Sequence, residues 1–330
     1  MIKSRKYCQG HLPPFRCCPE TASTIMAVQL IVVVLILPVA YFRFGIRSAF
    51  IIFSCGLVGA LAQVTLLRIS GKKSFGSNAH SALLGILAAL MLPVDVDLHI
   101  AIFAAIAAVL LGKYIFGGLG NYFLHPALLG TAITYILFRD NILIVSGTLR
   151  NLTASSMQNL DLAENIRKFG DLSDFLLGNA SGCICQSASL FFIIMGIYFI
   201  YRGYINWRSV VIYILTISIL SVFCPLNIID PAGRDIGKMS IFMMNPSLGQ
   251  WVTFLAYEIF AGSIIFTAFI LHADMASRPI TNRGQYLFAC IAAALTIILQ
   301  FYTTIPLPAP AAMLIAGMLS RPIDNLTRPK

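Results

Sequence analysis

The sequence predicts an all-α integral membrane protein with about ten transmembrane helices, arranged as two five-helix inverted halves with broken helices. Of its 330 residues, 58% are hydrophobic and only 11% are charged, against about 25% charged in an average soluble domain. Apolar runs recur from Met26 to Leu319, and a membrane-spanning helix needs about 20 such residues. A soluble globular domain is therefore excluded.

The apolar runs divide the chain into five parts. We expect a cytoplasmic tail at 1–25, a first membrane half at 26–138, an external loop at 139–186, a second membrane half at 187–320 and a cytoplasmic tail at 321–330. No cleaved signal peptide is expected, because the first apolar run continues into another without a small-residue cleavage site. The predicted spans are 26–42, 48–67, 80–92, 98–115, 122–138, 187–201, 209–226, 249–271, 285–303 and 307–320.

An odd number of spans in each half would invert one half relative to the other, which places functional sites on interrupted helices near the midplane. Such interruptions are present: the third span is short, the fourth runs into Gly117, Gly118 and Gly120, and prolines follow in both halves. For any one of them, a tight turn between helices is the alternative. Together they predict a cavity between the halves, because irregular backbone at membrane depth needs protein or a water-filled cavity to satisfy its polar groups.

The net charge of +10 reflects topology. With the N-terminus inside, the cytoplasmic segments carry 15 Lys and Arg against 3 acids, counting Lys113 at the inner end of the fourth span, and the external segments carry 8 against 9. This asymmetry follows the positive-inside rule. We therefore expect both termini to be cytoplasmic, and we expect a lipid bilayer and no nucleic acid as the environment of the chain.

No metal or haem site is predicted from the cysteines and histidines. The eight cysteines match no zinc pattern, and His80, His99 and His125 do not share a spacing such as i, i+4. The glycines at 117–120 are not a phosphate loop either, because they lack the preceding strand and the following Lys-Ser or Lys-Thr.

Several short stretches, taken in order along the chain, resemble one family of membrane proteins. The main ones are Asn78-Ala79-His80-Ser81-Ala82-Leu83-Leu84-Gly85, Lys113-Tyr114-Ile115-Phe116-Gly117-Gly118-Leu119-Gly120 with Pro126-Ala127, Phe175-Leu176-Leu177-Gly178-Asn179, Tyr204-Ile205-Asn206-Trp207-Arg208, Thr281-Asn282-Arg283-Gly284 and Ile323-Asp324. The sequence is similar, from about Ser23 to Pro329, to the RnfD and NqrB family. Members are membrane subunits of Rnf and of sodium-translocating NADH:quinone oxidoreductase complexes.

The chain also departs from the family pattern. Cys185-Gln186-Ser187-Ala188 stands where the family has Gly-Glu-Thr-Ser, and Ile305-Pro306-Leu307-Pro308 stands where it has Tyr-Pro-Glu-Gly. Two carboxylates of the family pattern are thus absent, which indicates a diverged member.

The resemblance implies a subunit of an Rnf- or Nqr-like complex in the bacterial cytoplasmic (inner) membrane. Its partners would be the other subunits, and it would couple electron transfer to the movement of Na+ or H+. The implied cofactor is FMN, joined through its phosphate to a threonine in an external Ser-Gly-Ala-Thr sequence; riboflavin is a further implied cofactor. The alternative is a flavin-free membrane scaffold or passive transporter that keeps the fold and has lost the redox centre. A self-sufficient enzyme is not expected, because the chain has no nucleotide-binding domain.

The flavin attachment motif is not intact in this chain. Ser146-Gly147-Thr148 resembles it with the alanine deleted, and Thr153-Ala154-Ser155-Ser156 resembles it with conservative substitutions. Thr148 is therefore the first candidate for attachment and Ser156 the second. The alternative is an ordinary polar loop.

Two acids are candidates for an ion pathway. Glu258 lies about mid-span in the eighth apolar run, where an acid is expensive in lipid and marks a functional site by default. Asp274 lies in the next loop, where it could line an ion route or orient a flavin amide. For Glu258 the alternative is structural use inside the bundle, and for Asp274 a satisfied loop carboxylate.

The backbone at Gly117, Gly118 and Gly120 could approach either a flat cofactor ring or a neighbouring helix closely. Of the two, we expect contact with a neighbouring helix.

Overall fold

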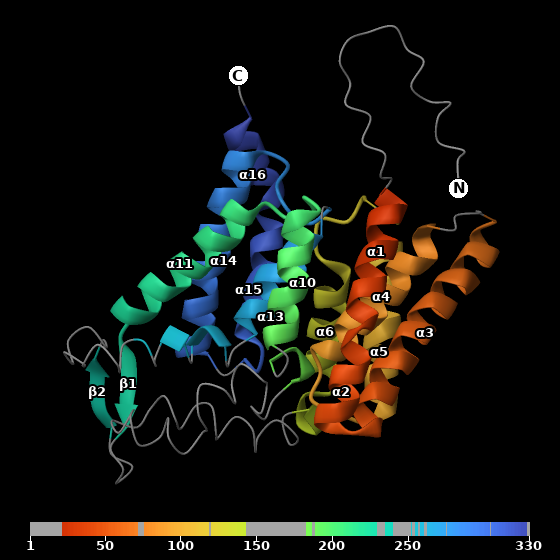
Figure 1. Ribbon diagram of the computed structural model, residues 1–330, viewed down its shortest axis with the longest axis horizontal. Helices are drawn as coiled ribbons and strands as arrows, with labels where there is room; N and C mark the ends of the chain where they lie inside the picture. The colour runs from red at the N-terminus through yellow and green to blue at the C-terminus, as the bar shows by residue number, and fades with distance from the viewer. Residues whose placement is uncertain are drawn as a thin grey trace, which may run out of the picture.

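The protein is a predominantly helical bundle (Figure 1). The computed structural model describes residues 22–71, 76–118, 120–142, 183–186, 189–229, 235–239, 252, 255–256, 258–260, 263–274, 276–303 and 305–328. The α-helices are α1 Ala22–Val34, α2 Ile36–Phe44, α3 Ile46–Ser70, α4 Gly76–Leu90, α5 Leu98–Ala107, α6 Pro126–Leu137, α10 Ser189–Tyr201, α11 Trp207–Phe223, α13 Ile264–Phe269, α14 Asn282–Tyr302, α15 Pro308–Met318 and α16 Ser320–Thr327. A π-helix, η1 Ala108–Tyr114, continues α5, and two 3-10 turns lie at η2 Ile184–Gln186 and η4 Leu271–Ala273.

Several of these helices are apolar enough for a membrane. Three are also long enough to cross one, by length and composition: Thr24–Phe44, Ile46–Ser70 and Asn282–Tyr302. Seven shorter apolar helices accompany them within the described part of the chain. The predicted class of an α-helical membrane protein is confirmed at this level.

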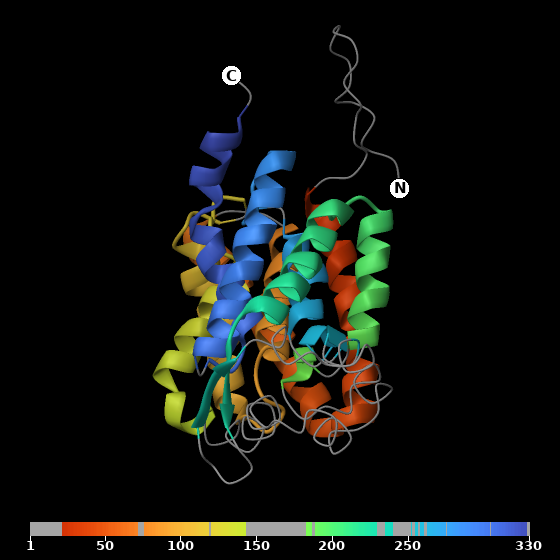
Figure 2. The same ribbon diagram turned by 90° about the vertical axis from the view of Figure 1, so that its left-hand side faces the viewer.

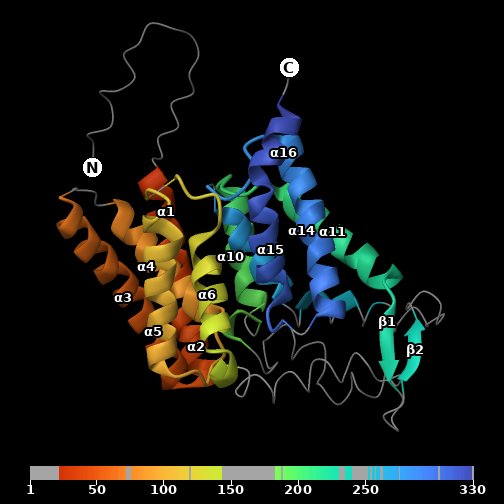
Figure 3. The same ribbon diagram turned by 180° about the vertical axis from the view of Figure 1, so that it is seen from behind.

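The helices gather into two groups that lie side by side. Helices α1 to α6 form one group and α10 to α16 the other, as the front and rear views both show (Figures 1 and 3). Helix α6 packs against α15 where the groups meet. The bundle therefore places the start of α1 and the end of α16 at the same end.

Prolines set several helix boundaries. Pro38 has no N–H to donate to the carbonyl of Val34, so the first apolar run is broken into α1 and α2 at Leu35. Pro126 is the first residue of α6, where a missing N–H costs nothing. The fifth helix therefore begins four residues later than the predicted start at 122.

One feature of the fold was not predicted. Strands β1 Leu226–Ile229 and β2 Asp235–Met239 form an antiparallel hairpin with a bulge between Ile228 and Ile229. The hairpin lies at the end of the bundle opposite α16 (Figure 2). The apolar run of α11 continues into β1, so composition alone did not separate the helix from the strand.

Glycines bring α3 and α4 into close contact. A Cβ added at Gly85 would lie 2.3 Å from the carbonyl oxygen of Cys55, and one added at Gly59 would lie 2.5 Å from that of Ser81. Small residues at helix crossings let backbones approach in this way, and the packing that results drives helix association in lipid.

We expect Gly85→Ala to lower the thermal unfolding midpoint of the detergent-purified protein. The added methyl group must push against backbone, and overpacking of this kind costs about 1–3 kcal/mol. Gly317→Ala is the matched control, because its Cβ would stay 3.5 Å from the nearest atom, an ordinary contact distance. Equal unfolding midpoints for the two variants would contradict this account of the α3–α4 crossing.

Candidate functional site

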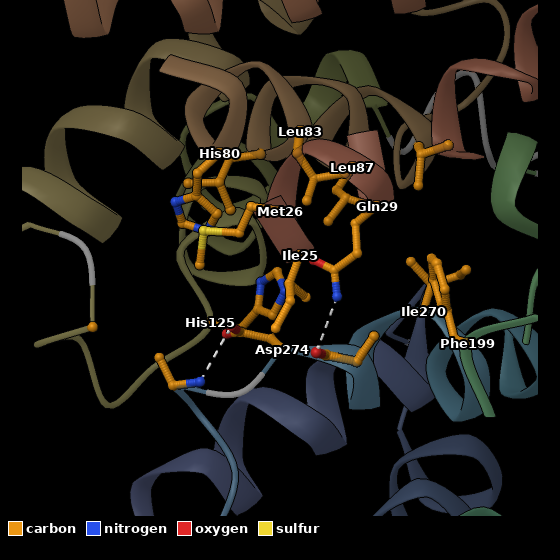
Figure 4. Close-up of a pocket in the computed structure, with 15 residues that line it drawn as sticks. Ile25, Met26, Gln29, His80, Leu83, Leu87, His125, Phe199, Ile270 and Asp274 are labelled. Atoms are coloured by element: carbon orange, nitrogen blue, oxygen red, sulfur yellow. Dashed lines mark hydrogen bonds between the residues drawn. The ribbon is translucent and has the colours of Figure 1, made fainter. Parts of the chain in front are cut away.

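A cavity of about 260 Å³ lies between α1, α4 and the chain around Asp274 (Figure 4). Most of its wall consists of apolar side chains from α1 and α4. Its polar side chains are those of Gln29, His80, His125 and Asp274. The volume is slightly below the ~300 Å³ at which ligand pockets usually begin. A cavity with a mostly apolar wall and a few convergent polar groups is the expected form of a small-molecule site.

The predicted glycines form the turn that leads from η1 towards this cavity. Gly117, Gly118 and Gly120 have φ angles of 94°, 96° and 88°, which residues with a Cβ rarely adopt. Gly120 lines the cavity, whereas Gly117 and Gly118 do not.

The expected contact of these glycines with a neighbouring helix is not observed among the described residues. Within that part of the chain, a Cβ at Gly118 or Gly120 would meet no atom within 4 Å, and one at Gly117 would meet only the side chain of Asn121. The positive φ angles of these three residues explain why glycine occupies their positions. Close helix approach in this region instead involves Gly112, where a Cβ would lie 2.6 Å from Pro126, and Gly130, where it would lie 2.5 Å from Ala108.

A chain of hydrogen bonds joins the two helix groups beside the cavity. The Tyr122 hydroxyl lies 3.2 Å from Nε2 of His80 and 3.1 Å from Oδ1 of Asp274. The His80 and Tyr122 rings are stacked, with an interplanar angle of 7°. His80 belongs to α4 and Asp274 follows η4, so Tyr122 connects side chains from opposite halves of the sequence.

Asp274 is held in place from several directions. Ser277 donates to its Oδ2 at 2.9 Å, and the backbone N–H of Ala276 donates to Oδ1 at 3.3 Å. Gln29 of α1 donates to the carbonyl of Ala273 at 3.2 Å, as Figure 4 shows. Burial lowers the pKa of the Arg278 guanidinium, and the negative charge of Asp274 opposes that shift. Asp274 therefore fixes its own loop as well as facing the cavity.

A second set of hydrogen-bonded polar side chains lies next to the first, within helices α1 to α6. Lys113 of η1 is 1% exposed, and its Nζ lies 2.6 Å from Oγ of Ser81. Ser81 also donates to Oε1 of Gln63 at 3.0 Å. Because Ser81 follows His80 directly in α4, the two polar groups occupy the same turn of that helix. A π-helix within an α-helix is often found at functional sites.

Two ring nitrogens in the cavity wall have no hydrogen-bond partner among the described residues. They are Nδ1 of His80 and Nδ1 of His125, and both are buried. Buried polar atoms are normally satisfied, so unpaired ones indicate a missing water, ion or ligand. A polar atom of a bound molecule would satisfy these nitrogens.

The predicted ion-pathway acids are not brought together. Glu258 is 1% exposed and lies near the start of α10, because Ser189 donates to the carbonyl of Phe260 at 2.8 Å. Among the described residues, the side chain of Gln300 near the end of α14 is close enough to interact with the carboxyl group, although no donor reaches either oxygen with good hydrogen-bond geometry. Asp274 lies instead at the end of the bundle where α1 begins.

The candidate flavin attachment residues, Thr148 and Ser156, lie outside the described residues. No group of three or more His, Cys, Asp or Glu side chains in the described ranges could hold a metal ion.

Sequence reasoning missed the residues that build the site. Gln63, Tyr122 and Gln29 carry no charge and give no signal in an apolar sequence. From the sequence alone, His80 is rejected as a metal ligand, and no role is assigned to Lys113. The usable signal was position: His80, Ser81 and Lys113 all lie inside the stretches that carry the family resemblance.

Comparison with known proteins gives a consistent result. The sequence profile of the NQR2, RnfD, RnfE family matches residues 11–330. One subunit of the Na(+)-translocating ferredoxin:NAD(+) oxidoreductase complex of Acetobacterium woodii is 27% identical, covering 96% of this chain and 92% of its own. The corresponding subunit of the proton-translocating ferredoxin:NAD(+) oxidoreductase complex of Clostridium ljungdahlii is 24% identical, covering 99% and 96%. That of an ion-translocating oxidoreductase complex of Methanosarcina acetivorans is 23% identical, covering 82% and 79%. Because the family profile matches almost the whole chain, this protein belongs to the NQR2, RnfD, RnfE family.

Proposed function

We propose that this chain is the RnfD-type membrane subunit of an Rnf-like ion-translocating electron-transport complex. In this role it carries flavin and couples electron transfer to the movement of Na+ or H+. The observation that carries the proposal is the cavity itself, with polar side chains in its wall and, beside it, the hydrogen bond from Tyr122 to Asp274 that joins the two helix groups. The names of its relatives support membership in a complex with other subunits. They do not choose the ion, since one relative belongs to a Na+-translocating complex and another to a proton-translocating one.

The cavity is the proposed site of a flavin ring. The apolar side chains of Leu83, Leu84 and Leu87 would cover the ring face, and Gly120 leaves room for a flat group. The unpaired Nδ1 atoms of His80 and His125 would bond the polar edge of the ring. The flavin supplies one- and two-electron chemistry that no side chain can supply, while the protein holds and orients it.

The ion route is proposed to run between the two acids. Asp274 lies at one end of the bundle, and Glu258 lies buried towards the other. A charged group inside a membrane protein costs about 2.5–3.5 kcal/mol or more, so such acids are kept where they bind or relay ions. Glu258 in this role would exchange a proton or hold a cation at the outer end, and Asp274 would do so at the inner end.

The finer architecture is also a proposal. In the described ranges, five apolar helices precede the 139–186 segment and five follow it, which supports ten spans in two inverted halves. The charge asymmetry supports cytoplasmic termini in a bacterial cytoplasmic membrane.

In this arrangement, reporter fusions at Lys72 and Asp161 should report opposite faces of the membrane. If both reporters appear on one side, the ten-span arrangement is wrong.

For flavin attachment, we expect Thr148→Ala to remove covalent flavin from the chain. Thr148 keeps the threonine of the family motif and follows a glycine, which leaves the hydroxyl accessible to a transferase. Ser156→Ala is the matched control and should have less effect. In-gel fluorescence of the denatured polypeptide, followed by mass spectrometry of the loop peptide, measures the attachment.

Each result of that experiment has a distinct meaning. FMN on Ser156 would reverse the ranking of the two residues. An unmodified peptide from cells that contain the transferase would favour the flavin-free scaffold. Flavin that acid releases from the Thr148→Ala protein would be bound non-covalently. It would therefore report on the proposed flavin in the cavity independently of covalent attachment.

For ion coupling, we expect Glu258→Gln to reduce ion uptake to background while the complex still assembles. The amide keeps the shape of the side chain but cannot exchange a proton or carry a charge. Uptake into inverted vesicles, measured during electron transfer by the assembled complex, tests this. Asp95→Asn, a change of the same chemistry at an exposed position, is the control. Normal uptake in the Glu258→Gln complex would leave Glu258 a structural residue.

A further inference from the structure

A second hollow, polar rather than apolar, lies at the end of the bundle where α11 and α14 begin. It is a groove of about 370 Å³, and its main polar lining comes from Asn206, Arg208, Arg278, Asn282, Gln285 and Tyr286. Figure 1 shows the starts of both helices at the same end of the bundle as α16. Two of the family-like stretches, Tyr204-Ile205-Asn206-Trp207-Arg208 and Thr281-Asn282-Arg283-Gly284, converge here, and the proposed electron transfer uses neither.

The groove is built by hydrogen bonds among its own residues. Asn206 caps α11 by accepting from the backbone N–H of Arg208 at 3.2 Å, and its amide donates to Oε1 of Gln285 at 3.2 Å. Gln285 in turn donates to the carbonyl of Pro279 at 3.1 Å. The lining side chains are thus held in fixed positions before any ligand binds.

The charge of the groove is positive. Its lining contains two guanidinium groups, and no acidic side chain is among the described lining residues. Asp274 acts on Arg278 from the cavity side. The described partners of the Arg208 side chain are neutral: the Tyr286 side chain and the ring of Trp207, whose centroid is 5.6 Å from the Arg208 Cζ. Arg208 is therefore available to an anion.

The surface beside the groove is apolar and faces outward. Trp207 is 54% exposed at its edge, and Val211, Leu215 and Ile219 follow at four-residue intervals as an exposed row along α11. Tryptophan and arginine at the end of a spanning helix mark the level of the lipid headgroups. An acyl chain attached to a headgroup in the groove would lie along this row.

We propose that the groove binds the phosphate headgroup of an anionic phospholipid, with Arg208 as the main charged contact. Basic pockets between transmembrane helices bind such headgroups. Free phosphate carries the same anionic group, but it has no acyl chain to contact the exposed apolar row. The proposal does not depend on electron transfer or on flavin.

Trp207 provides a direct test, because the chain has only two tryptophans, Trp207 and Trp251. The full chain with Trp251→Phe is purified in detergent, and its fluorescence is quenched with phosphatidylglycerol or phosphatidylcholine that carries brominated acyl chains. We expect phosphatidylglycerol to quench at a severalfold lower mole fraction. Arg208→Gln should reduce that preference by about fivefold, since one basic residue contributes about 1 kcal/mol near an anionic surface. Arg208→Lys should keep part of the preference.

Arg328→Gln is the matched control, because it removes the same charge near the same end but outside the groove, and it should leave the preference unchanged. If Arg208→Gln does not run as a single species on size exclusion, Tyr286→Phe replaces it and should lower the preference in the same direction. Equal quenching by the two lipids would overturn the proposal. An unchanged preference in the folded Arg208→Gln variant would also overturn it. If that variant in addition loses other subunits when the complex is purified, the groove is a contact with another protein. Competition by inorganic phosphate at constant ionic strength would assign the site to free phosphate instead.

Discussion

The hydrocarbon layer offers no water to satisfy polar groups, so an interior donor or acceptor of this protein is stabilised by a partner inside the bundle. The sequence places Lys113, Ser81, Gln63, His80 and Tyr122 among apolar helices, and the structure pairs them. Ser81 lies between Lys113 and Gln63, while Tyr122 lies between His80 and Asp274. The helix interruptions occur near these pairs, because a π-helix or a glycine turn moves side chains to positions that a regular helix would not reach.

Close packing of α3 and α4 makes the first of these pairings geometrically accessible. Gly59 allows the backbone of Ser81 to approach, and Gln63 lies one turn further along the same face of α3. The hydrogen bond between Gln63 and Ser81 and the glycine crossing are therefore two parts of the same contact. Crowding at the crossing would separate the polar atoms as well as the helices.

The sequence predicted the apolar helices well because lipid selects composition directly, and charge-free runs are visible without any tertiary information. It placed the short third helix and the glycine turn correctly for the same reason. It missed the break at Leu35, which depends on one hydrogen bond lost at Pro38, and the β1–β2 hairpin, whose residues continue an apolar run. It also missed the link from Tyr122 to Asp274, because the two residues are 152 positions apart and only folding brings them together. Thr148 and Ser156 remain predictions.

The loop from Asp274 to Thr281 belongs to both hollows of the molecule. Asp274 and Ala276 line the cavity, Arg278 lines the groove, and the backbone N–H groups of Ile280 and Thr281 are held by Asp324 of α16. A loop tied at three points cannot be moved at one without strain at the others. Any molecule that shifts this loop when it occupies one hollow must therefore change affinity at the other, and thermodynamic reciprocity makes the factor the same in both directions. If a lipid in the groove shifts this loop, the composition of the surrounding membrane would change the affinity of the cavity for its occupant.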